Sequence, residues 1–133
     1  MRYMLDTNIC IYVIKHKPES VLRELKKLDP EDVCISSITY AELAYGVEKS
    51  AQTERNRLAL AMMLSCIGIV AFDDAAASEY GEIRAGLEKG GTPIVSMDML
   101  IAAHAKATGC TLVTNNTKEF CRVKGLKVVN WVK

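Results

Sequence analysis

Short apolar runs alternate along the chain with longer amphipathic segments, and this alternation restricts the fold more than any other feature of the sequence. The runs end in polar or turn-forming residues and cover 3–5, 33–35, 69–72, 111–114 and 127–129. Segments with helical periodicity separate nearly every pair of runs, and parallel strands require such crossovers. The sequence therefore predicts an α/β fold with a central, mostly parallel sheet flanked by helices.

Capping residues place the expected helices. Pro18 is tolerated in a first turn, Asp73 and Ser96 are good N-terminal caps, and Gly109 is a typical helix stop. The helices are expected at 8–14, 18–28, around 40–47, at 54–63, from Asp73-Asp74 to Gly90-Gly91, from Ser96 to Gly109, and as a short turn holding Glu119 and Phe120.

The chain has the size and composition of one domain. Its 133 residues, half of them hydrophobic and a quarter charged, contain no repeat or linker, so we expect a single domain over residues 1–133. The five cysteines form no CxxC pair and are accompanied by only two histidines, which argues against a zinc site. We expect free cysteines in the core of a protein from a reducing compartment.

The apolar runs also bear on location and partners. No run approaches the ~18 residues of a membrane span, and Asp6 interrupts the N-terminus too early for a secretory signal. The expectation is a soluble, cytoplasmic protein with no membrane partner. Because the net charge is only +1, any nucleic-acid partner has to meet local basic patches.

Acidic side chains follow several of the predicted strands. Asp6 comes directly after the first strand, 36–42 follows the second, and 115–119 follows the strand at 111–114. Open α/β sheets bind ligands beyond the carboxyl ends of their strands. We therefore expect these three segments to converge on one edge of the sheet.

Each acid also has a purely structural explanation. Asp6 is a good helix cap, and Glu42 fits a capping box that begins at Thr39 and places it in a first helical turn. Asp98 lies in the first turn of its helix, where the helix dipole favours an anion. Glu119 follows Asn116 in another segment resembling a capping box.

Together the four acids indicate a metal site. Like charges about 4 Å apart repel by roughly 1–4 kcal/mol per pair, so such a cluster needs protons or a cation. Carboxylates select Mg²⁺, with Mn²⁺ as a substitute, and such an ion acidifies water and polarises a phosphodiester. The neighbouring hydroxyls and amides could orient the carboxylates: Thr7, Asn8, Thr114 and Asn116.

Four segments resemble the motifs of PIN-domain nucleases, and specifically of VapC toxins, the ribonuclease half of type II VapBC toxin–antitoxin pairs. They are MLDTN at 4–8, ISSITYAELAYG at 35–46, DMLIAAHA at 98–105 and TNNTKEF at 114–120. The resemblance covers essentially the whole chain. It implies a three-layer PIN-like fold, Mg²⁺-dependent endoribonuclease activity, a homodimer, and a higher-order complex with a neutralising VapB-like antitoxin.

The resemblance also assigns roles to residues. Asp6, Glu42 and Asp98 match the family's acidic core and are expected to be catalytic and to bind the metal. Many members carry a fourth acid where this chain has Asn116, so Glu119, one helical turn on, is the expected substitute. The loop at 93–97 departs from the glycine-containing form of close relatives.

Basic residues are the expected RNA contacts. Lys118 and Arg122 flank the predicted site, and contacts of this kind position RNA without reading its sequence. Other basic groups, among them Lys15/Lys17 and Arg55/Arg57, are expected to form solvated faces. The few aromatic residues offer no stacking platform for single strands, which favours a structured RNA such as transfer RNA.

One histidine and two apolar segments have no clear catalytic role. His104, six positions after Asp98 on one helix, is expected to be a packed or surface histidine rather than a base. The apolar residues of 9–14 and 40–47 exceed what one small helix buries. Part of that surface could accept an antitoxin helix, with packing inside the domain as the alternative.

Two other functions remain open at this stage. A phosphohydrolase of the haloacid-dehalogenase kind would use Asp6 as a covalent nucleophile, but such enzymes usually carry a second aspartate where this chain has Asn8. A non-enzymatic receiver domain would also gather acids around Mg²⁺. Receivers normally carry paired acids after the first strand, whereas this chain has Asp6 alone.

Overall fold

The computed structural model describes residues 2–133, and its centre is a parallel sheet. In the described part of the chain the sheet has five strands in the order β3-β2-β1-β4-β5, and all four pairings are parallel. Met4 lies opposite Cys34 on one side and Leu112 on the other. The strands are β1 Tyr3–Leu5, β2 Val33–Ser36, β3 Gly68–Val70, β4 Thr111–Val113 and β5 Val128–Val129.

Helices connect the strands. They are α1 Thr7–Lys15, α2 Glu19–Lys26, the 3₁₀ turn η1 Pro30–Asp32, α3 Ser37–Glu48, α4 Thr53–Leu64, α5 Asp74–Lys89, α6 Ser96–Thr108 and α7 Thr117–Phe120. The predicted elements all occur, with shifted ends. Val95, not Ser96, occupies the cap position of α6 and makes no side-chain cap bond. β3 ends before Phe72, whose N–H donates to Ser37 Oγ (3.0 Å) at the start of α3.

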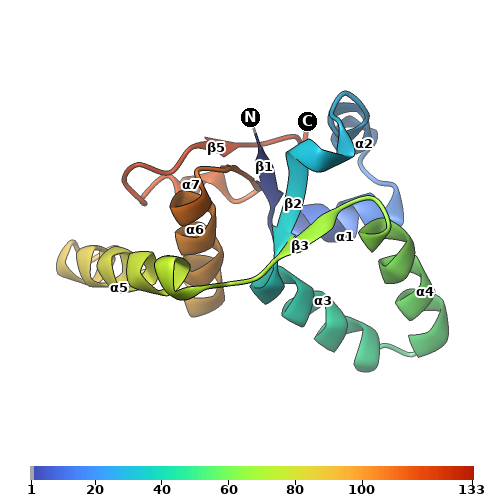
Figure 1. Cartoon of the computed structure of the whole chain (residues 1–133), viewed down its shortest axis with the longest axis horizontal. Coiled ribbons are helices and arrows are strands. Elements are labelled where there is room, and N and C mark those ends of the chain that lie inside the picture. The colour runs from blue at the N-terminus through green and yellow to red at the C-terminus, as the bar shows by residue number, and fades with distance from the viewer. Residues whose placement is uncertain (1) are drawn as a thin grey trace.

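The helices form two layers, one on each face of the sheet. Figure 1 shows α5 and α6 on one side, and α1, α3 and α4 on the other. Successive strand residues point to opposite faces, so the core divides in two. Met4 and Leu112 belong to the cluster with α5 and α6, whereas Leu5 and Val113 belong to the cluster with α1 to α4. The predicted three-layer α/β fold is confirmed.

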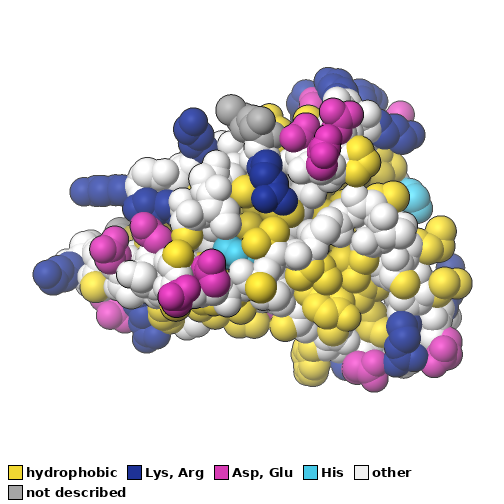
Figure 2. Space-filling view, viewed as in Figure 1, with side chains coloured by type: hydrophobic (Ala, Val, Ile, Leu, Met, Phe, Trp, Pro, Cys, Tyr) yellow, Lys and Arg dark blue, Asp and Glu magenta, His cyan; other side chains and the backbone are white. Residues whose placement is uncertain are grey.

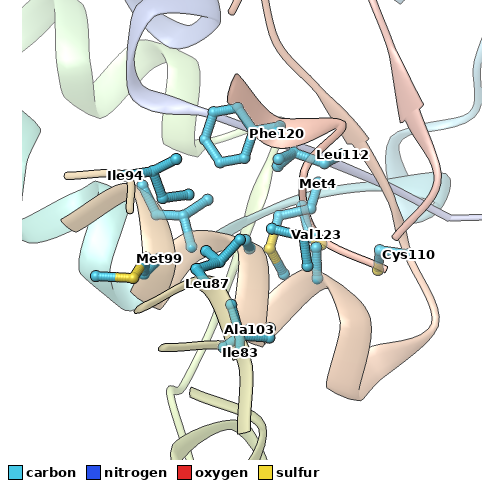
Figure 3. Packing of buried hydrophobic residues seen from close by; sticks show 14 residues of the cluster. Met4, Ile83, Leu87, Ile94, Met99, Ala103, Cys110, Leu112, Phe120 and Val123 are labelled. Atoms are coloured by element: carbon cyan, nitrogen blue, oxygen red, sulfur yellow. The ribbon is translucent and has the colours of Figure 1, made fainter. Parts of the chain in front are cut away.

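The α5–α6 core fixes the orientation of the helix that carries Asp98. Ile83 and Leu87 of α5 pack with Met99 and Ala103 of α6, and Phe120 of α7 belongs to the same cluster (Figure 3). Phe120 is almost fully buried. These contacts hold α6 and α7 rigidly at the end of the sheet where the acids lie.

The cysteines are only partly as expected. All five are free, and Cys10, Cys34 and Cys110 are buried. Cys66 and Cys121 are exposed, so the expectation of core cysteines is wrong for these two. Both lie just beyond the end of a helix, a position from which a side chain can reach solvent. Within residues 2–133, no helix is long and apolar enough to cross a membrane.

Candidate active site

The strand order reverses at the end of the sheet where the acids lie, and we call the region between the ends of β1 and β4 the crevice. The chain adds β2 and β3 on one side of β1, then β4 and β5 on the other, so the order reverses between β1 and β4. Crevices at such a reversal, beyond the carboxyl ends of the strands, are the usual ligand sites of open parallel sheets. The backbone N–H of Asp6 donates to Val113 O (3.0 Å) and fixes Asp6 at this point.

Asp6 is both a helix cap and a buried acid. Its Oδ1 accepts the backbone N–H of Ile9 (2.9 Å), which caps α1. The residue is only 5% exposed, and burial raises the pKa of its carboxyl, with a smaller increase from Glu42. Hydrogen bonds from Thr114 and Ile9 lower that pKa but do not cancel the increase. Because a carboxylate has about four acceptor positions, the cap leaves capacity for a ligand.

Asp98 connects the four predicted acids electrostatically. It is the third residue of α6 and is half-buried. Burial and then the charges of Asp6, Glu42 and Glu119 raise the pKa of Asp98 to about 6. The acids at or near the first turns of α1, α3, α6 and α7 therefore lie close enough to act on Asp98, as the sequence predicted for the segments after β1, β2 and β4.

Glu42 occupies a different helical position from the predicted one. Ser36, not Thr39, is the cap of α3, and its Oγ accepts the N–H of Ile38 (3.1 Å). Thr39 is fully buried inside the helix, so the expected capping box is wrong and Glu42 lies in the second turn. The Glu42 carboxylate instead accepts a hydrogen bond from Thr7 Oγ1, which joins α3 to the start of α1.

The segment after β4 supplies a buried hydroxyl and the fourth acid. Thr114 is fully buried, and its Oγ1 accepts the backbone N–H of Asn116 (2.9 Å). Asn116 occupies the cap position of α7 without a side-chain cap bond, so Glu119 is not part of a capping box. Glu119 is half-buried and close enough to act on Asp98. Asn8 is exposed, unlike the half-buried Thr7 beside it.

The oxygen-rich site fits a hard divalent cation. Among residues 2–133, no three acidic, histidine or cysteine side chains already stand in a metal-binding arrangement. The acids nevertheless act on one another, because the pKa of Asp98 is raised first by burial and then by the charges of the other three. A cation shared by these carboxylates would remove this repulsion, and oxygen donors favour Mg²⁺-like ions over zinc.

Sequence reasoning did not find the structural role of His104. Of the packed and surface positions predicted for it, the side chain takes the packed one: it is fully buried and lies edge-on to Phe72, with ring centroids 5.3 Å apart. Its Nδ1 is 2.7 Å from Ser36 Oγ, and burial lowers the pKa of the imidazole. Because Ser36 caps the helix of Glu42 and His104 belongs to the helix of Asp98, this contact fixes one helix against the other. No signal in one sequence pairs residues 68 positions apart.

The predicted phosphate contacts lie on the surface. Lys118 and Arg122 are both exposed. Lys118 belongs to α7, next to Glu119. The Arg122 Nη1 donates to Pro93 O (3.3 Å) in the loop before α6, so this guanidinium also holds the loop that presents Asp98.

The fold, the crevice and its acids define a member of the PIN-domain family. The family model matches residues 3–126, and the chain belongs to this family. Within it, the chain is similar to VapC proteins. It is 48% identical to the tRNA(fMet)-specific endonuclease VapC of Shigella flexneri over 98% of both chains, and 47% identical to Ribonuclease VapC2 of Rickettsia felis over 100% of both.

Solved structures give the same result. The chain is similar to one in the VapBC2 complex of Rickettsia felis bound to a promoter DNA fragment, with a TM-score of 0.92, 46% identity and coverage of 98% and 99%. A chain of DNA-bound VapBC from Salmonella typhimurium also gives 0.92, at 44% identity and 98% coverage of both. The predicted resemblance to PIN-domain VapC proteins is confirmed. It favours the nuclease over the phosphohydrolase and the receiver domain.

Proposed function

We propose that this chain is a divalent-cation-dependent endoribonuclease toxin that hydrolyses phosphodiester bonds in RNA. The observation that supports this most directly is the pKa of Asp98, raised to about 6 by burial and by three other carboxylates from separate elements. Such a concentration of uncompensated negative charge destabilises a fold unless a cation or protons neutralise it. VapC relatives named ribonucleases or tRNA endonucleases, 44–48% identical, support the activity.

The proposed cation is Mg²⁺, for which Mn²⁺ can substitute. Divalent-metal dependence is a general property of PIN-domain nucleases. Asp6, Glu42 and Asp98 would hold the ion, and Glu119 would act as the fourth acid in place of Asn116. When bound, the ion supplies Lewis-acid polarisation of the phosphodiester and a more acidic water.

The residues around the acids hold them in place. Thr7 fixes the Glu42 carboxylate by its hydrogen bond, and Thr114 contributes a hydrogen bond that favours the charged form of Asp6. Asn8 and Asn116 are proposed to complete this surrounding shell. Such partners orient metal ligands, and their removal typically costs about 10–100-fold in affinity or activity.

The proposed substrate is a structured RNA such as transfer RNA. Two relatives carry the name tRNA(fMet)-specific endonuclease. The exposed Lys118 and Arg122 would hold phosphates of the substrate.

The proposed protein partner is a VapB-like antitoxin. The similar structures are VapBC complexes. Figure 2 shows hydrophobic side chains gathered over α3 and toward α4. Tyr45 of α3 and Leu58 and Met62 of α4 are 66%, 64% and 66% exposed. An apolar antitoxin segment would cover such a surface. By contrast, Ile9 is fully buried in the domain's own core, so the expected surplus at 9–14 is partly internal packing.

The proposal extends to assembly and location. We propose a homodimer that forms a higher-order complex with the antitoxin, a single PIN domain over residues 1–133, and a cytoplasmic location. Co-expression with the small open reading frame beside the gene is expected to restore growth that the chain alone arrests. Growth arrest that persists with that reading frame would contradict the antitoxin proposal.

The decisive test is RNA cleavage by the purified chain. We expect it to cut transfer RNA in Mg²⁺ and to stop when EDTA is added. Asp6→Asn and Asp98→Asn should each lower kcat by at least about 10³-fold, because the cation loses a charged ligand. The matched control is Asp29→Asn, an exposed aspartate that makes no side-chain cap bond. Full Mg²⁺-dependent cleavage by Asp6→Asn would contradict the proposal.

A further inference from the structure

A second polar region lies at the end of α1 away from Asp6. A hollow of about 500 Å³ separates the end of α1 from the first turns of α4. Lys15, His16 and Lys17 line one side, and Arg55 lines the other. The amide side chains Gln52 and Asn56 also face it, and none of the described residues that line it is acidic. Two basic groups 40 positions apart in the sequence thus form one surface.

The charges of this hollow are not neutralised within the protein. The ion pairs of residues 2–133 leave out Lys15, Lys17 and Arg55. The Arg55 Nη1 donates instead to the neutral Gln52 Oε1 (3.0 Å). Arg57, two positions on, binds both Glu48 (2.6 Å) and Glu54 (2.7 Å). The positive charge at the hollow therefore stands out in a chain whose net charge is only +1.

Helix geometry explains only part of this arrangement. Lys15 lies in the last turn of α1, where a cation balances the helix dipole. Neither Lys17 nor Arg55 has such a role. The positive N-terminal end of α4 also points here, and Gln52 at its cap position makes no side-chain cap bond. The first backbone N–H groups of α4 therefore add further donors and positive potential.

We propose that the hollow binds the phosphate backbone of the RNA substrate away from the cut. This rests on the proposed ribonuclease function. Lysine, arginine and amide side chains are typical phosphate contacts, and they position a nucleic acid without reading its sequence. The nine residues of α1 place the hollow roughly 13 Å from Asp6. This corresponds to about four nucleotides at roughly 3.4 Å each along a stacked strand.

The test measures RNA affinity against salt. Fluorescein-labelled bulk transfer RNA is titrated with the full chain in EDTA, so that cleavage does not interfere. The logarithm of the association constant falls linearly with log[salt], and each lost phosphate contact should make this slope less steep by about 0.7–0.9. The salt dependence of the triple variant Lys15→Gln/Lys17→Gln/Arg55→Gln should therefore be less steep by about 2–3. Its affinity for RNA at 0.1 M salt should fall by on the order of 100-fold. In Mg²⁺ its KM should rise while its kcat at saturating RNA stays unchanged.

A matched control removes three positive charges elsewhere. Arg57→Gln/Arg84→Gln/Lys89→Gln changes the net charge equally but leaves the hollow intact, and its slope should stay close to that of the wild type. The charge-conserving variant Lys15→Arg/Lys17→Arg/Arg55→Lys should retain the wild-type slope.

The outcomes separate the two proposals. A triple variant with the slope of the control would overturn the hollow as an RNA site. A wild-type chain that binds RNA but does not cut it would contradict the ribonuclease proposal alone, because the binding comparison still decides the hollow. A wild-type chain with no affinity for RNA would overturn both.

Discussion

The acids of the crevice and those of the outer α3–α4 surface differ in how their charges are balanced. Glu48 and Glu54 both bind Arg57, and these three side chains are largely exposed. In the crevice, Asp6, Glu42, Asp98 and Glu119 act on one another, and the pKa of Asp98 rises to about 6. Among residues 2–133, none of the ion pairs neutralises those four.

This difference separates charges that solvate a surface from charges that require a ligand. Exposed ion pairs contribute little to stability because water screens them and side-chain entropy opposes them. Buried like charges have a real cost, and a fold retains them where a bound cation offsets that cost. The two regions give opposite expectations for the same kind of substitution, and measurements can compare them directly.

The largest effect beyond loss of a carboxylate is expected at Thr7. Thr7→Val removes the hydroxyl that fixes Glu42 while keeping the side-chain volume. RNA cleavage should fall about 10–100-fold, because an unsupported carboxylate no longer holds its position. Single-turnover rates in Mg²⁺ measure the effect, Thr7→Ser should recover most of the activity, and Thr92→Val is an exposed control. Wild-type rates in Thr7→Val would mean that Glu42 needs no support.

The second expected effect concerns stability without metal. The pKa of Asp98 is about 6 in the folded protein, against an ordinary value of 3.8 for an aspartate, so the folded state favours the protonated form. The protonated Asp98 carboxyl contributes its full stabilisation of the folded state below pH 3.8, and this stabilisation is lost as the pH rises through 6. Asp98→Asn should therefore raise the free energy of unfolding at pH 8 by about 1–2 kcal/mol. This is less than the full energy of the pKa shift, because Asp98 is only half-buried and water screens part of its interactions.

Urea unfolding in EDTA at pH 4 and pH 8 measures this effect. The gain from Asp98→Asn should be present at pH 8 and nearly absent at pH 4, where the wild-type carboxyl is protonated. Asp29→Asn, from the exposed surface, should show no comparable pH dependence. A destabilised Asp98→Asn at pH 8 would contradict the expected cost of holding this carboxylate partly buried beside other acids.

The third expected effect is stabilisation by Mg²⁺. An ion that binds only the folded state adds about 1.4 kcal/mol at ten times its Kd. Thermal unfolding at pH 8 should shift upward with Mg²⁺, and the shift should shrink at pH 5, where protons compete for Asp98. Asp98→Asn should lose most of the shift. If Mg²⁺ raised the unfolding temperature of wild type and Asp98→Asn equally, the ion would bind at a site that does not include Asp98.

The sequence predicted the fold and the location of the site because both follow from local patterns. Apolar runs that end at Asp6 and Thr114 indicate strands. In a parallel sheet the carboxyl ends of the strands lie at one edge, which is where ligands bind. The hydrogen bond between Thr7 and Glu42 and the contact between Ser36 and His104 could not be predicted, because they join helices through tertiary packing.

The cap of α3 shows why local patterns fail at helix starts. Thr39 and Glu42 fit a capping box, but Ser36, the last residue of β2, forms the cap instead. Two capping residues three positions apart give the same signal, and only the end of the strand selects between them. Likewise, the sequence assigned Arg55 and Arg57 to one group, although they face different surroundings.

The smallest effect is expected at Arg57, on the balanced side of the comparison. Its side chain is exposed, and the neighbouring Glu48 and Glu54 raise its pKa. Arg57→Gln should leave the urea midpoint and the RNA cleavage rate unchanged within error at about 0.15 M salt. Both acids that it releases are exposed to water and lie outside the crevice. A clear loss of stability in Arg57→Gln, equal in size to the gain in Asp98→Asn, would remove the distinction between the two regions.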